Sequence, residues 1–295
     1  MKAFREGSCY VQDESSMLCA KLASVQKEQF VMDLCSAPGG KSLYVADQLK
    51  GSGRVLSRDL TEYKTDLIED NIDRVGFTNM ESEVFDARVL DEEHIEAADV
   101  VIADVPCSGL GIMGKKNDIK YHISEEGMKD LVKLQREILA NAVQYVKHGG
   151  TLIYSTCTVN PAENEENFRW ILDHFDFEAV DITKELPKDL KIETAQEGFI
   201  QLLPGIHPCD GFFIGKLRRN KVMDLKSMTL QEMQEYMESI GEKKFRAKQI
   251  YEWFHKHLAL SLDEMNNIPK KLKEKNRADT GCLWSQTSRL FYIKD

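Results

Sequence analysis

The chain has 295 residues, of which 42% are hydrophobic and 30% are charged, and its formal net charge is −10. This balance excludes extensive disorder and supplies enough apolar side chains for about two domains. No apolar run approaches the roughly 20 residues that cross a bilayer, and the first residues lack the apolar region of a secretory signal. We therefore expect a cytoplasmic protein without a membrane span. Because the chain is acidic, nucleic acid would have to bind through local basic patches.

Charge divides the chain into two parts. Residues 1–222 carry a net charge of −12 and residues 223–295 a net charge of +2, and the change falls near the basic segment 218–221. We predict a first domain over 1–222, a small helical domain over 223–275 and an unassigned tail over 276–295, where no periodicity is clear.

The first domain alternates strand and helix signals. Short apolar runs predict strands at 29–33, 53–57, 79–85, 98–103 and 151–155. Apolar spacing and capping residues predict helices at 41–50, 62–75, 124–148 and 162–174, the third of them ending at Gly149-Gly150. Segments 199–203 and 211–217 read as a closing antiparallel pair. This order predicts an α/β fold with a doubly wound sheet, whose ligands bind at the carboxyl ends of the strands.

A glycine-containing loop follows the first predicted strand. Its sequence is Asp33-Leu-Cys-Ser-Ala-Pro-Gly-Gly-Lys-Ser42. A phosphate-binding P-loop would need glycine where Cys35 stands, and the G-x-G-x-x-G fingerprint of dinucleotide-binding folds is absent. The P-loop is therefore the weakest interpretation. The others are a nucleoside-type cofactor held beside a carboxylate, and an ordinary strand-to-helix turn.

Acidic residues follow the second and third predicted strands. Asp59 ends the second strand, where a carboxylate commonly binds a ribose diol. Asp86 lies just past the third strand and is the analogous candidate for an adenine edge. From spacing alone, Asp86 is equally well explained as a solvated turn residue.

Cysteines stand on two of these loops. The chain has seven cysteines with wide spacings and no C-x-x-C pair, so we expect reduced thiols rather than a disulfide framework or a zinc site. They are Cys9, Cys19, Cys35, Cys107, Cys157, Cys209 and Cys282. Cys107 follows the fourth predicted strand, three residues after Asp104, and Cys157 follows the fifth. Two thiols at one edge of the sheet, beside an acid, indicate thiol chemistry.

The segments Asp33–Ser42, Asp104–Gly111 and Ser155–Glu166 resemble three motifs of the RsmB/Nop/Sun family. Cys9–Ser16 resembles that family's motif before the first strand, and His207–Leu217 resembles its closing hairpin. Together the resemblance covers roughly residues 3–219. The members of this family are S-adenosylmethionine-dependent RNA cytosine-C5 methyltransferases with a Rossmann-like class I sheet. Among them, this sequence resembles the bacterial 16S rRNA enzymes in particular.

The resemblance implies a role for each matched residue. Cys157 would be the nucleophile that adds to C6 of cytosine, and Cys107 would assist release of the product. Asp104 would hydrogen-bond the base near N3 and also line the cofactor site, and Lys41 would contact the polar edge of the base. Asp59 and Asp86 would hold the ribose and the adenine of S-adenosylmethionine. Its methionine part would lie against the backbone of the loop Cys35, Ser36, Ala37, Pro38, Gly39, Gly40 and Lys41.

The sequence departs from the family at both ends. Bacterial members usually carry an RNA-binding helical domain before the catalytic domain, so we expect this chain to be truncated at its front. Helical spacing predicts helices at 229–240 and 245–258. The segment Lys243–Trp253 resembles the N-terminal accessory domain of the radical-SAM 23S rRNA adenine-C2 methyltransferase. Two hypotheses follow. One is an rRNA cytosine-C5 methyltransferase, and the other is an inactive fusion that binds S-adenosylmethionine or RNA without turnover.

Overall fold

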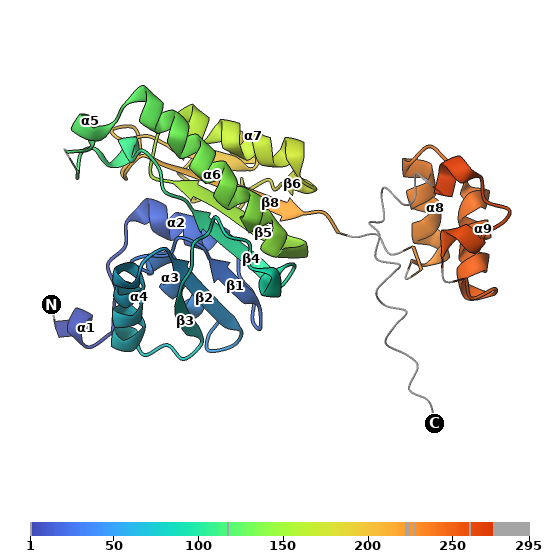
Figure 1. Cartoon of the computed structure of the whole chain (residues 1–295), viewed down its shortest axis with the longest axis horizontal. Helices are drawn as coiled ribbons and strands as arrows, with labels where there is room; N and C mark the ends of the chain where they lie inside the picture. The colour runs from blue at the N-terminus through green and yellow to red at the C-terminus, as the bar shows by residue number, and fades with distance from the viewer. Residues whose placement is uncertain (1, 117, 222–224, 227, 260, 274–295) are drawn as a thin grey trace. The chain divides into compact units, whose positions relative to one another are not determined.

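The chain forms two units, Met1–Asn220 and Lys221–Asp295, which are described here separately. The computed structural model (Figure 1) describes residues 2–116, 118–221, 225–226, 228–259 and 261–273. The predicted boundary at 222/223, the tail over 276–295 and Cys282 lie outside these residues.

Within its described residues the first unit is built on an eight-stranded sheet with the order β3-β2-β1-β4-β5-β8-β6, and β7 pairs with β8. The first five strands of this order are parallel, and β8 is antiparallel to β5, β6 and β7. The strands are β1 (Phe30–Asp33), β2 (Arg54–Asp59), β3 (Met80–Val84), β4 (Ala98–Asp104), β5 (Val146–Thr156), β6 (Phe177–Ala179), β7 (Phe199–Leu202) and β8 (Phe212–Arg219).

Helices cover both faces of this sheet because consecutive strand side chains point to opposite faces. On β1, Val31 packs in a core with α2 (Glu14–Leu22), α3 (Gly40–Gln48) and α4 (Glu62–Val75). The next residue, Met32, packs in a second core with α6 (Glu125–Tyr145) and α7 (Glu165–His174). Figure 1 shows α3 and α4 on one side of the strands and α6 and α7 on the other. The predicted doubly wound α/β fold is therefore confirmed.

The strand order reverses between β1 and β4, and this reversal positions the site. From β1 the chain continues through α3 to β2 on one side, whereas β4 pairs with the other side of β1. Ligands of doubly wound sheets bind in the crevice that such a reversal opens at the carboxyl ends of the strands. Asp33 ends β1 and Asp104 ends β4, so both lie at this edge.

Two predicted helix boundaries were wrong. The helix expected over 124–148 ends at Tyr145, and Gly149 lies inside β5 rather than at a helix terminus. Pairing of Val146 with Ala98, and a 3.0 Å hydrogen bond from Lys147 Nζ to Asp99 Oδ1, fix this segment as strand. Tertiary pairing here outweighs the local glycine signal.

The helix expected over 162–174 is interrupted at Asn164. A 3-10 turn, η3 (Pro161–Glu163), precedes it and α7 follows it. The backbone of Asn164 is not helical, with φ −115° and ψ −99°. Its side-chain amide donates to the carbonyl oxygen of Thr158 at 3.0 Å and to the Gln201 side chain at 2.7 Å. Side-chain bonds of this kind compete with continuation of a helix.

Several short elements were not predicted. The helices are α1 (Lys2–Arg5), α2 and α5 (Ile119–His122), and β6 is the added strand. Asp13 caps α2 by accepting a hydrogen bond from the Ser15 amide. The further 3-10 turns of this unit are η1 (Glu92–His94), η2 (Leu110–Ile112) and η4 (Glu193–Glu197).

The second unit packs two helices, α8 (Leu230–Ser239) and α9 (Lys244–His255), followed by the 3-10 turn η5 (Leu262–Glu264). Thr229 and Glu232 form a capping box at the start of α8. The fully buried residues Met237 and Ile250 belong to its core. Both predicted helices of this segment are present, with ends shifted by at most three residues. In the described part of the chain, no helix is long and apolar enough to span a membrane.

Candidate active site

A cavity of about 190 Å³ lies at the carboxyl ends of β1, β2 and β3 and brings together three of the predicted site residues: Cys35, Asp59 and Asp86. Its remaining lining is mostly apolar. The other residues are Leu34, Leu60, Lys64, Phe85, Ala87, Arg88, Pro106, Leu134 and Ile138. Burial, followed by the charges of Asp59 and Asp33, raises the pKa of the Cys35 thiol. Cys35 is therefore a neutral wall of the cavity rather than a thiolate.

Hydrogen bonds to backbone atoms hold the loop between β1 and α3 in place. The Gly39 amide donates to the Ser36 carbonyl oxygen at 2.7 Å, and the carbonyl of Pro38 accepts from Asn71 Nδ2 at 2.9 Å. Gly39 has φ +98°, a left-handed conformation that disfavours any residue with a Cβ. The helix α3 then begins at Gly40, so its free amides face the edge of the sheet where ligands bind.

Asp59 is almost fully buried at the end of β2 and is tied to this loop. One carboxylate oxygen accepts from the Ala37 amide at 2.9 Å, and the other accepts from the Leu60 amide and from Lys64 Nζ, both at 2.8 Å. These contacts hold the Asp59 carboxylate in one orientation at the wall of the cavity.

Asp86 lies on the loop after β3 and pairs with Arg88. Arg88 donates to both carboxylate oxygens, with its shortest contact, from Nη2 to Oδ2, at 2.6 Å. These hydrogen bonds lower the pKa of Asp86, so its carboxylate stays ionised. The adjacent Phe85 contributes an aromatic wall to the cavity.

Lys41 and Asp104 form a partly buried ion pair beside the glycine loop. Lys41 Nζ lies 2.5 Å from Asp104 Oδ2, and Ser155 Oγ donates to Asp104 Oδ1 at 2.8 Å. Burial alone would lower the pKa of Lys41, but the charge and the hydrogen bond of Asp104, together with the charge of Asp33, outweigh it and raise this pKa. Lys41 is therefore a fixed positive charge at this end of the sheet.

The two predicted cysteines meet across β4 and β5. Their Sγ atoms are 3.1 Å apart, and both side chains are half-buried. The hydrogen bond from Cys107 lowers the pKa of the Cys157 thiol, against burial and the charge of Asp104, and the charge of Lys41 lowers it further. The same bond, with burial, raises the pKa of Cys107. These opposite shifts make Cys157 the more acidic of the two thiols.

The sequence reasoning missed the carboxylate beneath these thiols. Glu163 is fully buried, and its Oε2 accepts from the Ser108 amide and from Gln135 Nε2, both at 2.9 Å. Its Oε1 accepts from Asn160 Nδ2 at 2.9 Å. Glu163 therefore joins the loop that carries Cys107 to the turn after Cys157. In the sequence it looks like one of several surface acids of a helix, so no signal marked it.

Across the described residues, no group of three or more His, Cys, Asp or Glu side chains is arranged to hold a metal ion.

Comparison with known proteins finds a family match in each of the two parts of the chain. A family profile described as "16S rRNA methyltransferase RsmB/F" matches residues 20–218, and one described as "Ribosomal RNA large subunit methyltransferase N-terminal domain" matches residues 223–279. Both resemblances seen in the sequence are therefore confirmed.

Curated relatives align with the first unit. A probable ribosomal RNA small subunit methyltransferase B of Bacillus subtilis is 39% identical over 219 residues, which are 73% of this chain and 49% of that protein. Ribosomal RNA small subunit methyltransferase F of Klebsiella pneumoniae is 34% identical over 222 residues, 74% of this chain and 46% of that protein. The chain thus spans about half the length of these relatives.

Two solved structures from Pyrococcus horikoshii share the fold. NSun6, solved with SFG, has a TM-score of 0.67 and 28% identity, over 75% of this chain and 56% of that one. A methyltransferase homologue has a TM-score of 0.63 and 29% identity, over 74% of this chain and 70% of that one. Since the first profile covers well over half of the sequence, the chain belongs to the 16S rRNA methyltransferase RsmB/F family.

Proposed function

We propose that the first unit transfers a methyl group from S-adenosylmethionine to C5 of a cytosine in RNA, with 16S rRNA as the substrate. The observation that carries this proposal is the thiol pair of Cys107 and Cys157, 3.1 Å apart at the carboxyl ends of β4 and β5. The names of the B. subtilis and K. pneumoniae relatives support rRNA of the small subunit as the substrate.

The residues around the cavity fit S-adenosylmethionine. The apolar and aromatic walls suit an adenine ring, and the buried Asp59 suits a ribose diol, to which a carboxylate can accept two hydrogen bonds. Asp86 would accept from the adenine amino group, and the backbone from Cys35 to Lys41 would hold the methionine part. The archaeal NSun6 structure contains SFG, an analogue of the same cofactor, which supports this assignment.

C5 of cytosine is not nucleophilic, so the base must be activated before it can accept a methyl group. When bound, S-adenosylmethionine supplies an electrophilic methyl group. The Cys157 thiolate would form a bond to C6, which places the electron pair of the C5=C6 bond on C5. Asp104 would hold N3 of the base, and its contacts with Lys41 and Ser155 keep the carboxylate in place for this task. The target base must leave its stack to reach these groups.

Release of the product would reverse the first bond. After methylation, a water molecule would accept the proton from C5, the C5=C6 double bond would form again, and the bond from C6 to Cys157 Sγ would break with its electron pair left on sulfur. Cys107 lies at hydrogen-bond distance from Cys157 Sγ, so it can stabilise the departing thiolate. Because the two cysteines have different roles, replacing each one should cause a different catalytic defect.

The test compares Cys157→Ala and Cys107→Ala in the 295-residue chain, with the exposed Cys9→Ala as control. Tritium transfer from labelled S-adenosylmethionine to rRNA is measured, and protein–RNA adducts are sought on denaturing gels. We expect Cys157→Ala to abolish transfer, Cys107→Ala to accumulate an adduct, and Cys9→Ala to behave as wild type. An adduct in Cys157→Ala would reverse the two roles.

Two further results would identify the activity. Bisulfite mapping of rRNA from cells with and without this gene would locate the modified cytosine. S-adenosylmethionine binding without any transfer to RNA would instead favour the alternative, an inactive fusion that only binds its ligand.

A further inference from the structure

The connection between β3 and β4 forms one wall of the cofactor cavity and contains no α-helix of its own. Residues 85–97 link the two strands and contain only the 3-10 turn η1. Four consecutive residues of this connection line the cavity: Phe85, Asp86, Ala87 and Arg88. A loop that forms a ligand-binding wall must be held by other contacts, and the structure shows which ones.

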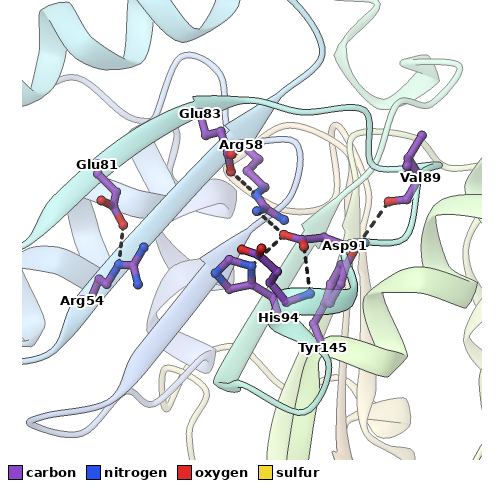
Figure 2. Close-up of polar contacts among 9 residues, drawn as sticks. Arg54, Arg58, Glu81, Glu83, Val89, Asp91, His94 and Tyr145 are labelled. Atoms are coloured by element: carbon purple, nitrogen blue, oxygen red, sulfur yellow. Dashed lines mark hydrogen bonds and ion pairs between the residues drawn. The ribbon is translucent and has the colours of Figure 1, made fainter.

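Arg58, on β2, binds this loop through its guanidinium group. Its side chain is 2% exposed and, on β2, points to the face opposite that of Asp59. Nε donates to Glu83 Oε2 at 2.7 Å, and Nη2 donates to Asp91 Oδ2 at 2.6 Å (Figure 2). The guanidinium also lies 4.3 Å from the centre of the Phe85 ring. The Arg58 guanidinium therefore connects Glu83 near the end of β3, the Phe85 ring that lines the cavity, and Asp91 at the other end of the loop.

A second set of contacts fixes that far end. Asp91 Oδ2 also lies 2.6 Å from His94 Nδ1, and the Asp91 amide donates to Tyr145 Oη at 2.9 Å. Tyr145, on α6, donates in turn to the Val89 carbonyl oxygen at 3.3 Å (Figure 2). Burial raises the pKa of Asp91, but the hydrogen bonds from Arg58 and His94 outweigh it and keep this pKa low. The Asp91 carboxylate is therefore a charged anchor.

We infer that Arg58, acting with Asp91 and Tyr145, is a positioning residue that holds loop 85–91 in the shape that completes the adenine side of the cofactor site. This inference rests on the proposed function, because it assigns the cavity to S-adenosylmethionine. Arg58 itself lines no part of the cavity, so it acts through Phe85 and the loop backbone.

Arg54 offers a matched comparison on the same strand and face. It pairs with Glu81 of β3 (Figure 2). It also lies over the ring of Phe30, but its side chain is 52% exposed. No contact of Arg54 reaches loop 85–91 among the described interactions. Its loss removes a β2–β3 ion pair without touching the cavity wall.

The test measures S-adenosylmethionine binding by calorimetry, and kcat and the two KM values, for Arg58→Met, Tyr145→Phe and Arg54→Met in the full chain. If the loop of a variant adopts the conformation that binds S-adenosylmethionine only a tenth of the time, the Kd for this cofactor rises about tenfold. We expect that rise in Kd and in KM for S-adenosylmethionine for Arg58→Met, and a rise of about threefold for Tyr145→Phe. The KM for RNA and the kcat at saturating cofactor should stay at the wild-type values, and Arg54→Met should behave as wild type.

A general loss of structure would lower kcat and weaken both substrates together, so the selective effect on one KM identifies positioning. If Arg58→Met does not fold, Tyr145→Phe decides, because it removes only one hydroxyl group. Unchanged cofactor affinity in the folded variants, or an equal loss in Arg54→Met, would overturn the inference. A wild-type chain that binds no S-adenosylmethionine would instead overturn the proposed function itself.

Discussion

Replacing Gly111 with alanine is expected to slow methyl transfer about a hundredfold by moving the backbone that carries Cys157. Gly111 lies in η2, where three backbone segments meet. Its amide donates to the Cys157 carbonyl oxygen at 3.1 Å, and its own carbonyl oxygen accepts from the Gly211 amide at 2.9 Å. These bonds place η2 directly against the loop after β5 and the residue before β8.

The size of the displacement follows from the contacts that a Cβ would make. A Cβ at Gly111 would lie 2.0 Å from the Gly211 carbonyl oxygen and 2.8 Å from the Cys157 carbonyl oxygen, whereas real Cβ contacts essentially never fall below 3.0 Å. Both close neighbours are backbone atoms, so η2 must separate by at least 1.0 Å from the Gly211 backbone and by at least 0.2 Å from that of Cys157. A misplacement of about 1 Å at a reacting group costs roughly a hundredfold in rate, and overpacking costs about 1–3 kcal/mol in stability.

The assay compares Gly111→Ala with Gly114→Ala, where an added Cβ meets no atom within 4 Å. Initial rates of tritium transfer to rRNA are measured together with S-adenosylmethionine affinity and thermal unfolding. We expect Gly111→Ala to lose rate while it keeps cofactor affinity, since Gly111 does not line the cavity. A wild-type rate for Gly111→Ala, or an equal loss for Gly114→Ala, would refute the reasoning.

Two further predictions concern the thiols and a buried acid. Hydrogen peroxide should inactivate transfer by joining Cys107 and Cys157, whose sulfur atoms are 3.1 Å apart. One peroxide and two thiols give one disulfide and two waters, so mass spectrometry should show a loss of two hydrogen atoms that dithiothreitol reverses. Burial raises the pKa of Asp33 to about 6, above its usual 3.8, so the folded state binds this proton more tightly than the unfolded state. Stability from this group is therefore lost as pH rises from about 4 through about 6, and urea unfolding should show Asp33→Asn gaining about 2 kcal/mol relative to wild type between pH 4 and pH 8.

The position of the site could be predicted because parallel strands end at one edge of the sheet. Once the strands at 29–33 and 98–103 are recognised, Asp33 and Asp104 must come close together, whatever the details of packing. The pairing of Lys41 with Asp104, and of Cys107 with Cys157, follows from the same geometry. The sequence could not show which thiol is the more acidic, because that depends on a hydrogen bond between side chains 50 residues apart.

The supporting residues could not be predicted for a different reason. Arg58 and Glu163 are charged residues in segments rich in charge, and in such a sequence they read as solvated surface. Each is buried only because the fold brings partners to it. Glu83 and Asp91 pair with Arg58, and a ring of amides surrounds Glu163. A buried charge without such partners would be too costly to retain, so the partners and the burial have to be found together.

Consecutive side chains of β2 point to opposite faces of the sheet, and residues on both faces support the cavity. Asp59 points toward the side of α3 and α4, where Lys64 and the glycine loop hold its carboxylate. Its neighbour Arg58 points to the side of α6, and there it anchors the loop that carries Phe85. A shift of β2 by one residue would exchange these two side chains and lose both contacts at once. The parallel register of Arg58 with Glu83, and of Asp59 with Val84, is thus a condition for the site as well as for the sheet.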